Sequence, residues 1–152
     1  MVCGSDRADG LTMRFEQQVD GSVATEFDCG PTFLGYPDRL QGAVVAMLLD
    51  AGMTHCLFAR DVASLTAKLN TRYHRAVMPG VPVVVRARIV ETKAPLYYLG
   101  AQVVQDGDLC AAAKGTFWDS ACGDLVHDTP ADATGASEAC LRPVTSQSRR
   151  RL

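Results

Sequence analysis

The sequence predicts an α+β protein in which an antiparallel β-sheet wraps around one long central helix. The first observation is a long apolar stretch with helical periodicity, from about residue 41 to residue 58, that contains no proline. The second is a series of β-type stretches after residue 62, separated by short turns and not by further helices. Because a single apolar helix needs a sheet to cover it, the two observations together favour a sheet wrapped around the helix.

A β-hairpin is expected ahead of the helix. Residues 11–18 and 22–28 are half-apolar runs on either side of Asp20-Gly21, a dipeptide typical of two-residue hairpin turns. Residues 29–39 are rich in glycine and proline, so we expect a loop there that leads into the helix.

Long antiparallel strands are expected after the helix. They are predicted at residues 63–77, 81–93, 96–105 and 108–118. Asp106-Gly107 between the last two is a second hairpin turn. Apolar and polar residues alternate along the first strand, which places Thr66 on the opposite face from Leu69 and Tyr73.

Length and composition indicate one folded domain. The chain has 152 residues, of which 47% are hydrophobic and 21% charged, as in an ordinary globular protein. We place the domain at residues 1–128. Residues 129–152 are small, polar and unpatterned, so they cannot bury enough apolar surface to offset the entropy of ordering, and a disordered tail is expected there.

Charge and hydropathy exclude several classes of function. A net charge of −2 gives no electrostatic case for binding nucleic acid or an anionic membrane surface. No apolar run reaches the roughly twenty residues of a membrane-spanning helix, and the first ten residues lack the apolar core of a secretion signal. We therefore expect a cytoplasmic protein. The sequence also lacks the serine-hydrolase elbow GxSxG, the P-loop and the dinucleotide glycine fingerprint.

The six cysteines do not suggest a disulfide framework or a metal site. No two of them form a CxxC pair, and several lie in apolar segments, so reduced thiols are expected, with Cys56 and Cys110 as small core residues. The three histidines lie near no paired cysteines. Neither a metal nor another cofactor is expected.

Asp50 is the first candidate for chemistry. It is a single carboxylate in the middle of the apolar helix, flanked by alanine, valine, methionine and leucine. Burying an unpaired carboxylate costs several kcal/mol or more, and buried groups of this kind cluster at functional sites. The alternative is a structural carboxylate, paired with an arginine or a backbone amide of a neighbouring strand.

Three stretches of the chain, one of which contains this carboxylate, are typical of a known family. They are Gln41-Gly42-Ala43 followed after six residues by Asp50, the segment TAKLNTRYHRAVMPG at 66–80, and the segment DGDLCAAAKGTF at 106–117. With them, the chain from Met13 to Trp118 resembles the hotdog-fold thioesterases of the phenylacetate-degradation type, which act on acyl-coenzyme A. The resemblance implies the hotdog fold, an antiparallel sheet around one long helix, with two subunits that pair their sheets into a dimer.

The resemblance also implies roles for residues of the helix. The amide of Gly42 would polarise the thioester carbonyl, and the carboxylate of Asp50 would act as a base or as a nucleophile. The chain departs from the family at three positions, because Gln41 replaces the usual His, Ala43 the second Gly, and Gly35 a frequent Asn. A carboxamide can form hydrogen bonds but cannot carry a proton as His can; in the family that His is chiefly an organiser.

The spacing of these residues predicts a site shared between two chains. Gly42 opens the helix, where unpaired amides and the positive end of the dipole favour a developing oxyanion. Asp50 lies eight residues further, about 12 Å along a helix, so one chain is not expected to bring both to the same carbonyl. The site is predicted in a homodimer or a dimer of dimers. Thr54, one turn beyond Asp50, and Thr66, where the family often has a water-positioning hydroxyl, are further candidates or else structural residues.

These patterns predict a thioesterase that hydrolyses an acyl-CoA or acyl-carrier thioester. The retention of Asp50 at the family spacing favours this interpretation. The alternative is a non-catalytic hotdog module that binds an acyl ligand or a partner protein, which the replacement of the His by Gln41 favours. Whether Asp50 activates a water or attacks the thioester directly stays open.

Overall fold

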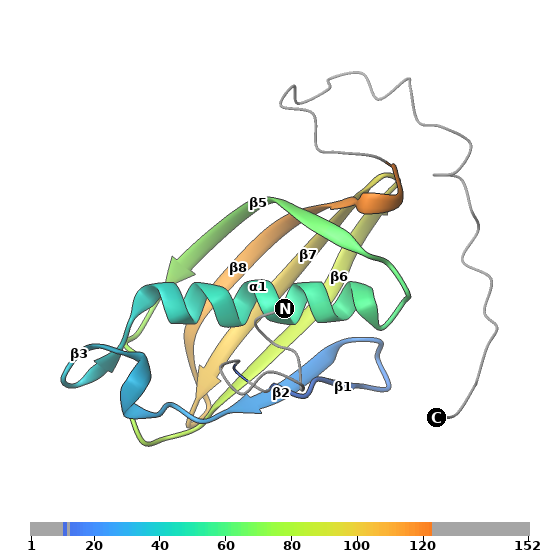
Figure 1. Cartoon of the computed structure of the whole chain (residues 1–152). Coiled ribbons are helices and arrows are strands. Elements are labelled where there is room, and N and C mark those ends of the chain that lie inside the picture. Colours follow the sequence, from blue (N-terminus) through green and yellow to red (C-terminus); the bar gives the residue numbers. More distant parts are fainter. Residues whose placement is uncertain (1–10, 12, 123–152) are drawn as a thin grey trace.

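A six-stranded antiparallel sheet curves around one long helix in the computed structural model of the chain (Figure 1), which describes residue 11 and residues 13–122. In chain order the elements are β1 (Glu16–Gln17), β2 (Val23–Phe27), the 3-10 helix η1 (Pro31–Phe33), β3 (Leu34–Tyr36), β4 (Arg39–Leu40), α1 (Gly42–Phe58), β5 (Ser64–Tyr73), β6 (Val83–Lys93), β7 (Leu96–Gln105), β8 (Asp108–Asp119) and the 3-10 helix η2 (Ser120–Cys122). The predicted fold class is confirmed. The tail predicted at 129–152 lies outside the described residues.

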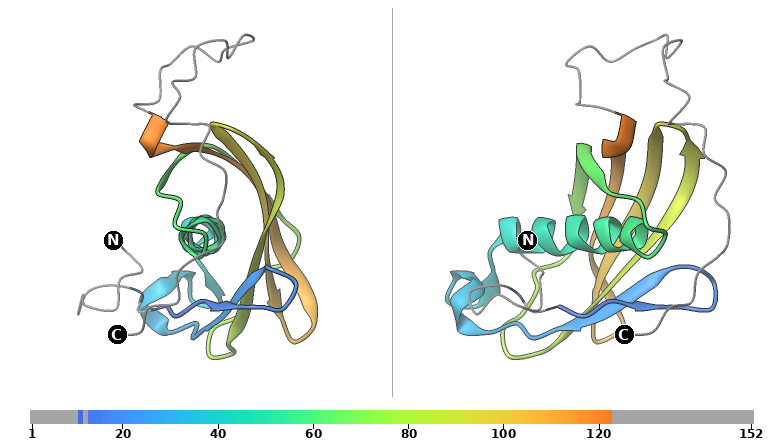
Figure 2. Two further views of the ribbon diagram at one scale, coloured as in Figure 1. Left: turned by 90° about the vertical axis from the view of Figure 1, so that its right-hand side faces the viewer. Right: turned by 45° about the vertical axis from the view of Figure 1, so that its right-hand side comes forward.

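The strand order of the sheet is β1-β2-β6-β7-β8-β5, and β3 and β4 form a separate two-stranded ribbon. Viewed along its axis, α1 lies in the hollow of the curved sheet (Figure 2). The short β1 forms one edge of the sheet, and the long β5 forms the other. The strand that follows the helix in the chain is therefore an edge strand.

The helix is packed on most of its surface. It runs from Gly42 to Phe58, close to its predicted bounds, and nine of its residues are buried. Leu48, Leu49 and Met53 are fully buried against the sheet. Each such side chain contributes about 1.5–3 kcal/mol of burial free energy, so the apolar character read from the sequence is what seats α1 in the sheet.

The segments around the helix agree with the expectations in part. The hairpin at residues 11–28 is confirmed as β1 and β2, with Gly21 at a φ of 78° in the turn. Asp106 and Gly107 both have positive φ, as a two-residue hairpin turn requires. The expectation of a loop at residues 29–39 is incomplete, because η1 and the small β3-β4 ribbon form there.

A β-bulge in β5 changes the faces that were expected for its side chains. Thr66 pairs with Phe117 and Lys68 pairs with Thr116, so Ala67 is the extra residue. The bulge turns Thr66 toward α1, on the same side of the sheet as Tyr73. The expectation that Thr66 and Tyr73 lie on opposite faces is therefore wrong, since strict alternation fails at one inserted residue.

The described cysteines follow the expectation except at one position. Cys29, Cys56 and Cys110 are buried free thiols. Cys122 is disulfide-bonded, so the expectation of reduced thiols is wrong there. No cluster of three metal-ligating side chains occurs within residues 13–122. None of the described helices is long and apolar enough to cross a membrane.

Gly115 of β8 lies where the sheet packs against the helix. A Cβ atom at this position would lie 2.6 Å from the Phe117 ring and 2.9 Å from the sulfur of Met53. Both neighbours are fully buried and have little room to move. We expect Gly115→Ala to lower the free energy of unfolding by about 1–3 kcal/mol, the usual cost of overpacking a core.

The measurement is urea unfolding of the full chain, with Gly30→Ala as the control. Gly30 has a φ of −69°, and a Cβ there would meet nothing within 4 Å. Its replacement should change the unfolding free energy by no more than about 0.5 kcal/mol. Equal effects of the two substitutions would contradict the close packing at Gly115.

Candidate active site

Asp50 lies in the middle of α1 and faces the edge strand β5. The Thr66 hydroxyl donates a hydrogen bond of 2.9 Å to Oδ1 of Asp50. The Asp50 side chain is half-buried. Among the described residues it has no arginine or lysine partner and accepts no backbone hydrogen bond. The structural pairing considered as the alternative role for Asp50 is thus not found in this part of the chain. A carboxylate with one oxygen uncommitted is suited to act as a base or a nucleophile.

The start of α1 presents backbone N–H groups. Gln41 is the N-cap, and its carbonyl accepts from the amides of Val44 and Val45. The two amides between them, those of Gly42 and Ala43, have no acceptor in the described part of the chain. Both residues are exposed. Such amides, at the positive end of the helix dipole, can stabilise a developing negative charge.

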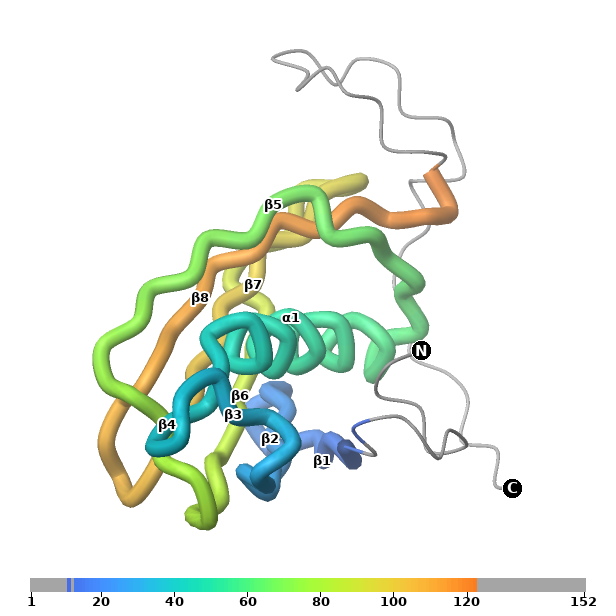
Figure 3. The backbone as a smooth tube through the Cα atoms, turned by 60° about the vertical axis from the view of Figure 1, so that its left-hand side comes forward, coloured from blue at the N-terminus to red at the C-terminus, as the bar shows by residue number. Residues whose placement is uncertain are grey.

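A second β5 residue contacts this end of the helix. The Tyr73 hydroxyl donates a hydrogen bond of 2.8 Å to the carbonyl oxygen of Gly42. The ring of Tyr73 also lies against Gly42, since a Cβ there would be 3.7 Å from three of its atoms. Figure 3 shows β5 along the edge of the sheet beside α1. The strand β5 thus donates hydroxyl hydrogen bonds to the helix at two residues, Gly42 and Asp50.

We call Gly42, Ala43 and Tyr73 the donor half-site, and Asp50 with Thr66 the acid half-site. Gly42 and Asp50 are eight residues apart on α1, which corresponds to about 12 Å along the helix axis. Within one chain, the amides and the carboxylate therefore do not converge on a single carbonyl group.

The five residues predicted from sequence are not all brought together. Asp50 and Thr66 share a hydrogen bond, and Gly42 exposes its amide, as described above. Thr54 is half-buried one turn beyond Asp50 and forms no hydrogen bond with it. The Gln41 side chain is exposed and makes no capping hydrogen bond.

Two features of the site were not found by sequence reasoning. Tyr73 was not singled out, because only the fold shows that the end of β5 meets the start of α1. Close packing also accounts for the glycine at position 35, since a Cβ there would lie 3.0 Å from the Cα of Gln41. A larger residue at that position would have to displace the backbone of the N-cap.

The buried thiols are poor candidates for nucleophiles. Burial raises the pKa of Cys29 to about 11, and burial also raises the pKa values of Cys56 and Cys110. The thiolate is the reactive form of cysteine. These three residues are thus held in their unreactive form at neutral pH, as expected of core residues.

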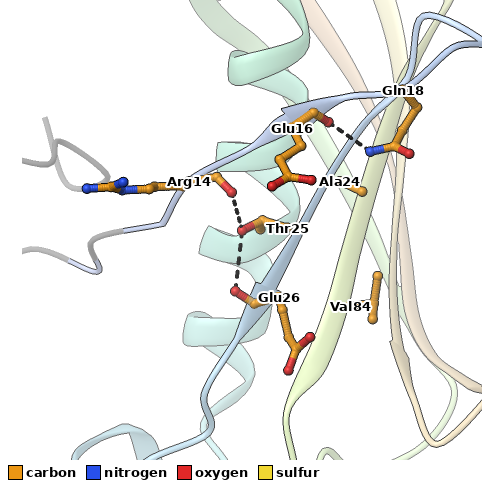
Figure 4. A pocket seen from close by; sticks show the side chains of 7 residues that line it. All are labelled: Arg14, Glu16, Gln18, Ala24, Thr25, Glu26 and Val84. Carbon is orange, nitrogen blue, oxygen red and sulfur yellow. Dashed lines mark hydrogen bonds between the residues drawn. The ribbon is translucent and has the colours of Figure 1, made fainter.

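A hollow on the surface is lined by residues that belong to neither half-site (Figure 4). This open groove of about 510 Å³ is formed by the strands β1, β2 and β6 and by the segment before β1. Its lining residues are Arg14, Glu16, Gln18, Ala24, Thr25, Glu26 and Val84. The Thr25 hydroxyl is already bonded to the carbonyl of Arg14, at 2.7 Å. The groove contains no residue of either half-site, so we do not assign the chemistry to it.

Comparison with known proteins identifies the family of the chain. The family model of the thioesterase-like superfamily matches residues 12–119. A protein of Thermoplasma acidophilum, provisionally named an esterase, is 23% identical over 117 residues, which are 72% of this chain and 88% of that protein.

Solved structures with the same fold carry thioesterase names. A thioesterase superfamily protein is 26% identical with a TM-score of 0.70; the match covers 75% of this chain but only 60% of that one. A phenylacetic acid degradation-related protein of Ralstonia eutropha, provisionally named a thioesterase, is 22% identical with a TM-score of 0.65, and the match covers 71% of this chain and 85% of that one. A protein of Streptococcus pneumoniae, named a hypothetical thioesterase and solved with coenzyme A, is 15% identical with a TM-score of 0.66, and the match covers 70% of this chain and 86% of that one.

The family match covers the helix, both half-sites and all the long strands of the sheet. The chain belongs to the thioesterase-like superfamily and has its hotdog fold.

Proposed function

We propose that this chain is a thioesterase that hydrolyses an acyl-CoA or acyl-carrier thioester in a site shared by two copies of the chain. The observation that carries the proposal is the pair of half-sites on α1, with free amides at its start and a hydroxyl-bonded carboxylate at its middle. Coenzyme A in the Streptococcus pneumoniae neighbour supports an acyl-CoA substrate.

The chemistry divides between the half-sites. The Gly42 amide of one chain polarises the thioester carbonyl and stabilises the oxyanion that forms on it. Asp50 of the other chain takes a proton from a water, whose oxygen bonds to the carbonyl carbon. The carbon–sulfur bond then breaks, and the leaving thiolate takes the proton from Asp50, so the products are a carboxylic acid and a thiol. In the alternative route, an Asp50 oxygen attacks the carbon, expels the thiolate and forms an anhydride that water cleaves.

The edge strand supports the pairing of two copies. In the described part of the chain, β5 pairs with β8 on one side only, so a row of backbone N–H and C=O groups is open on the other. Two large side chains of this strand, Leu65 and Tyr73, are 43% and 52% exposed. A second β5 in antiparallel register would cover both the backbone edge and these side chains.

One register of that pairing brings the two half-sites together. Tyr73 lies three ladder positions after Asn70, and Thr66 lies three positions before it once the bulged Ala67 is left out. An antiparallel pair with Asn70 on the two-fold axis therefore places Thr66 opposite Tyr73 of the partner subunit, on the side of the sheet that faces the helices. The acid half-site of each chain then adjoins the donor half-site of the other.

We expect Asp50→Asn to lower kcat at least about 100-fold, the lower range for loss of a general base. The assay follows thiol release from a panel of aliphatic and aromatic acyl-CoA thioesters. Asp28→Asn, which removes an exposed carboxylate outside both half-sites, is the control and should retain wild-type kcat. If the wild-type chain turns over no thioester faster than Asp50→Asn, the enzyme proposal fails and a binding module takes its place.

We expect Asn70→Cys to form a disulfide between two subunits under mild oxidation. Its Cα should face its own copy at about 5 Å across the strand pair, within the range that a disulfide spans. Arg72→Cys is the control, because it is exposed on the same strand but would lie about 14 Å from its copy in this register.

The measurement is a non-reducing gel that compares both variants with the wild type. A cross-linked dimer for Asn70→Cys alone supports the register. A dimer band of equal strength for Arg72→Cys, or none for either variant, counts against it.

A further inference from the structure

We propose that Tyr73 is a positioning residue, which holds the first peptide group of α1 so that the Ala43 amide serves as a second donor to the thioester oxygen beside the Gly42 amide. The inference rests on the proposed thioesterase function. It assigns a role to a side chain that lies outside the motif of Gly42 and Asp50.

The hydrogen bond of Tyr73 acts on one rigid unit. The carbonyl of Gly42, which accepts from the Tyr73 hydroxyl at 2.8 Å, belongs to the same planar peptide as the N–H of Ala43. Fixing the carbonyl oxygen therefore fixes the direction of the Ala43 N–H. A hydrogen bond at the carbonyl also polarises the peptide and strengthens its N–H as a donor.

This end of the helix has few other restraints. The N-cap Gln41 has no side-chain capping bond, and the amides of Gly42 and Ala43 have no acceptor in the described residues. Terminal turns of helices fray when their groups are unpaired. The Tyr73 contact comes from a strand that is itself held by a long ladder with β8, so it ties the first turn to the sheet.

The position of Tyr73 fits a role in the site better than a role in the core. Its side chain is 52% exposed, so burial in one chain contributes little to folding. In the register proposed above, Tyr73 lies opposite Thr66 of the partner subunit. The tyrosine would then stand at the junction of the two half-sites, where exclusion of water strengthens its hydrogen bond.

The test is Tyr73→Phe, which removes the hydroxyl and keeps the ring. We expect kcat to fall about five-fold, the effect of losing one ordinary hydrogen bond from the transition state, while KM and the dimer mass stay at the wild-type values. The substrate is the acyl-CoA that the wild type turns over fastest. Tyr98→Phe, on a half-buried tyrosine of β7 that contacts Lys93, is the control and should leave kcat unchanged.

A second measurement does not depend on activity. In proton–nitrogen NMR spectra of the full chain, the Ala43 amide resonance should move upfield in Tyr73→Phe and stay in place in Tyr98→Phe. An unmoved Ala43 resonance, or a moved resonance with unchanged kcat, overturns the inference. An inactive wild type contradicts the proposed thioesterase, and the Ala43 resonance then still decides whether Tyr73 holds the peptide.

Discussion

The packing of α1 into the hollow of the curved sheet is the constraint on which the rest of the structure depends. The helix buries residues on most sides, and Gly115 lets strand β8 come close enough to touch it. This packing determines the positions of the donor half-site and the acid half-site. The start of the helix stays open with its amides exposed, and the one carboxylate in its middle faces the edge of the sheet instead of the core.

The edge strand β5 contributes to both halves of the proposed site. It crosses the helix and ties it at two places, with Thr66 bonded to Asp50 and Tyr73 bonded to Gly42. Both ties depend on one bulged residue, Ala67, because without it the two hydroxyls would point to opposite faces of the sheet. The strand that organises each half-site is also the strand whose outer edge is open to a second copy, so the proposed chemistry and the proposed dimer share one element.

Much of this could be predicted from the sequence, and the reasons for the rest are physical. A continuous apolar helix with one carboxylate stands out because it breaks the rule that charges avoid the core, so α1 and Asp50 were found. The Asp-Gly dipeptides predicted the two hairpins, because glycine and aspartate accept the positive φ that tight turns require. The bulge in β5 leaves no mark in a pattern of period two, and the contact between Tyr73 and Gly42 joins residues 31 positions apart. Neither follows from local sequence alone.

A mixing experiment tests the shared site most directly. Gly42→Pro removes the donor amide at a first helical position, where proline is well tolerated and the extended Gln41 before it suits a proline. Each of Gly42→Pro and Asp50→Asn should be inactive alone. After the two are unfolded together and refolded at equal amounts, random pairing makes half of the dimers mixed, each with one intact site of two, and about a quarter of wild-type activity should return. If the mixture stays as inactive as its components while mixed dimers form, the site lies within one chain and the account is contradicted.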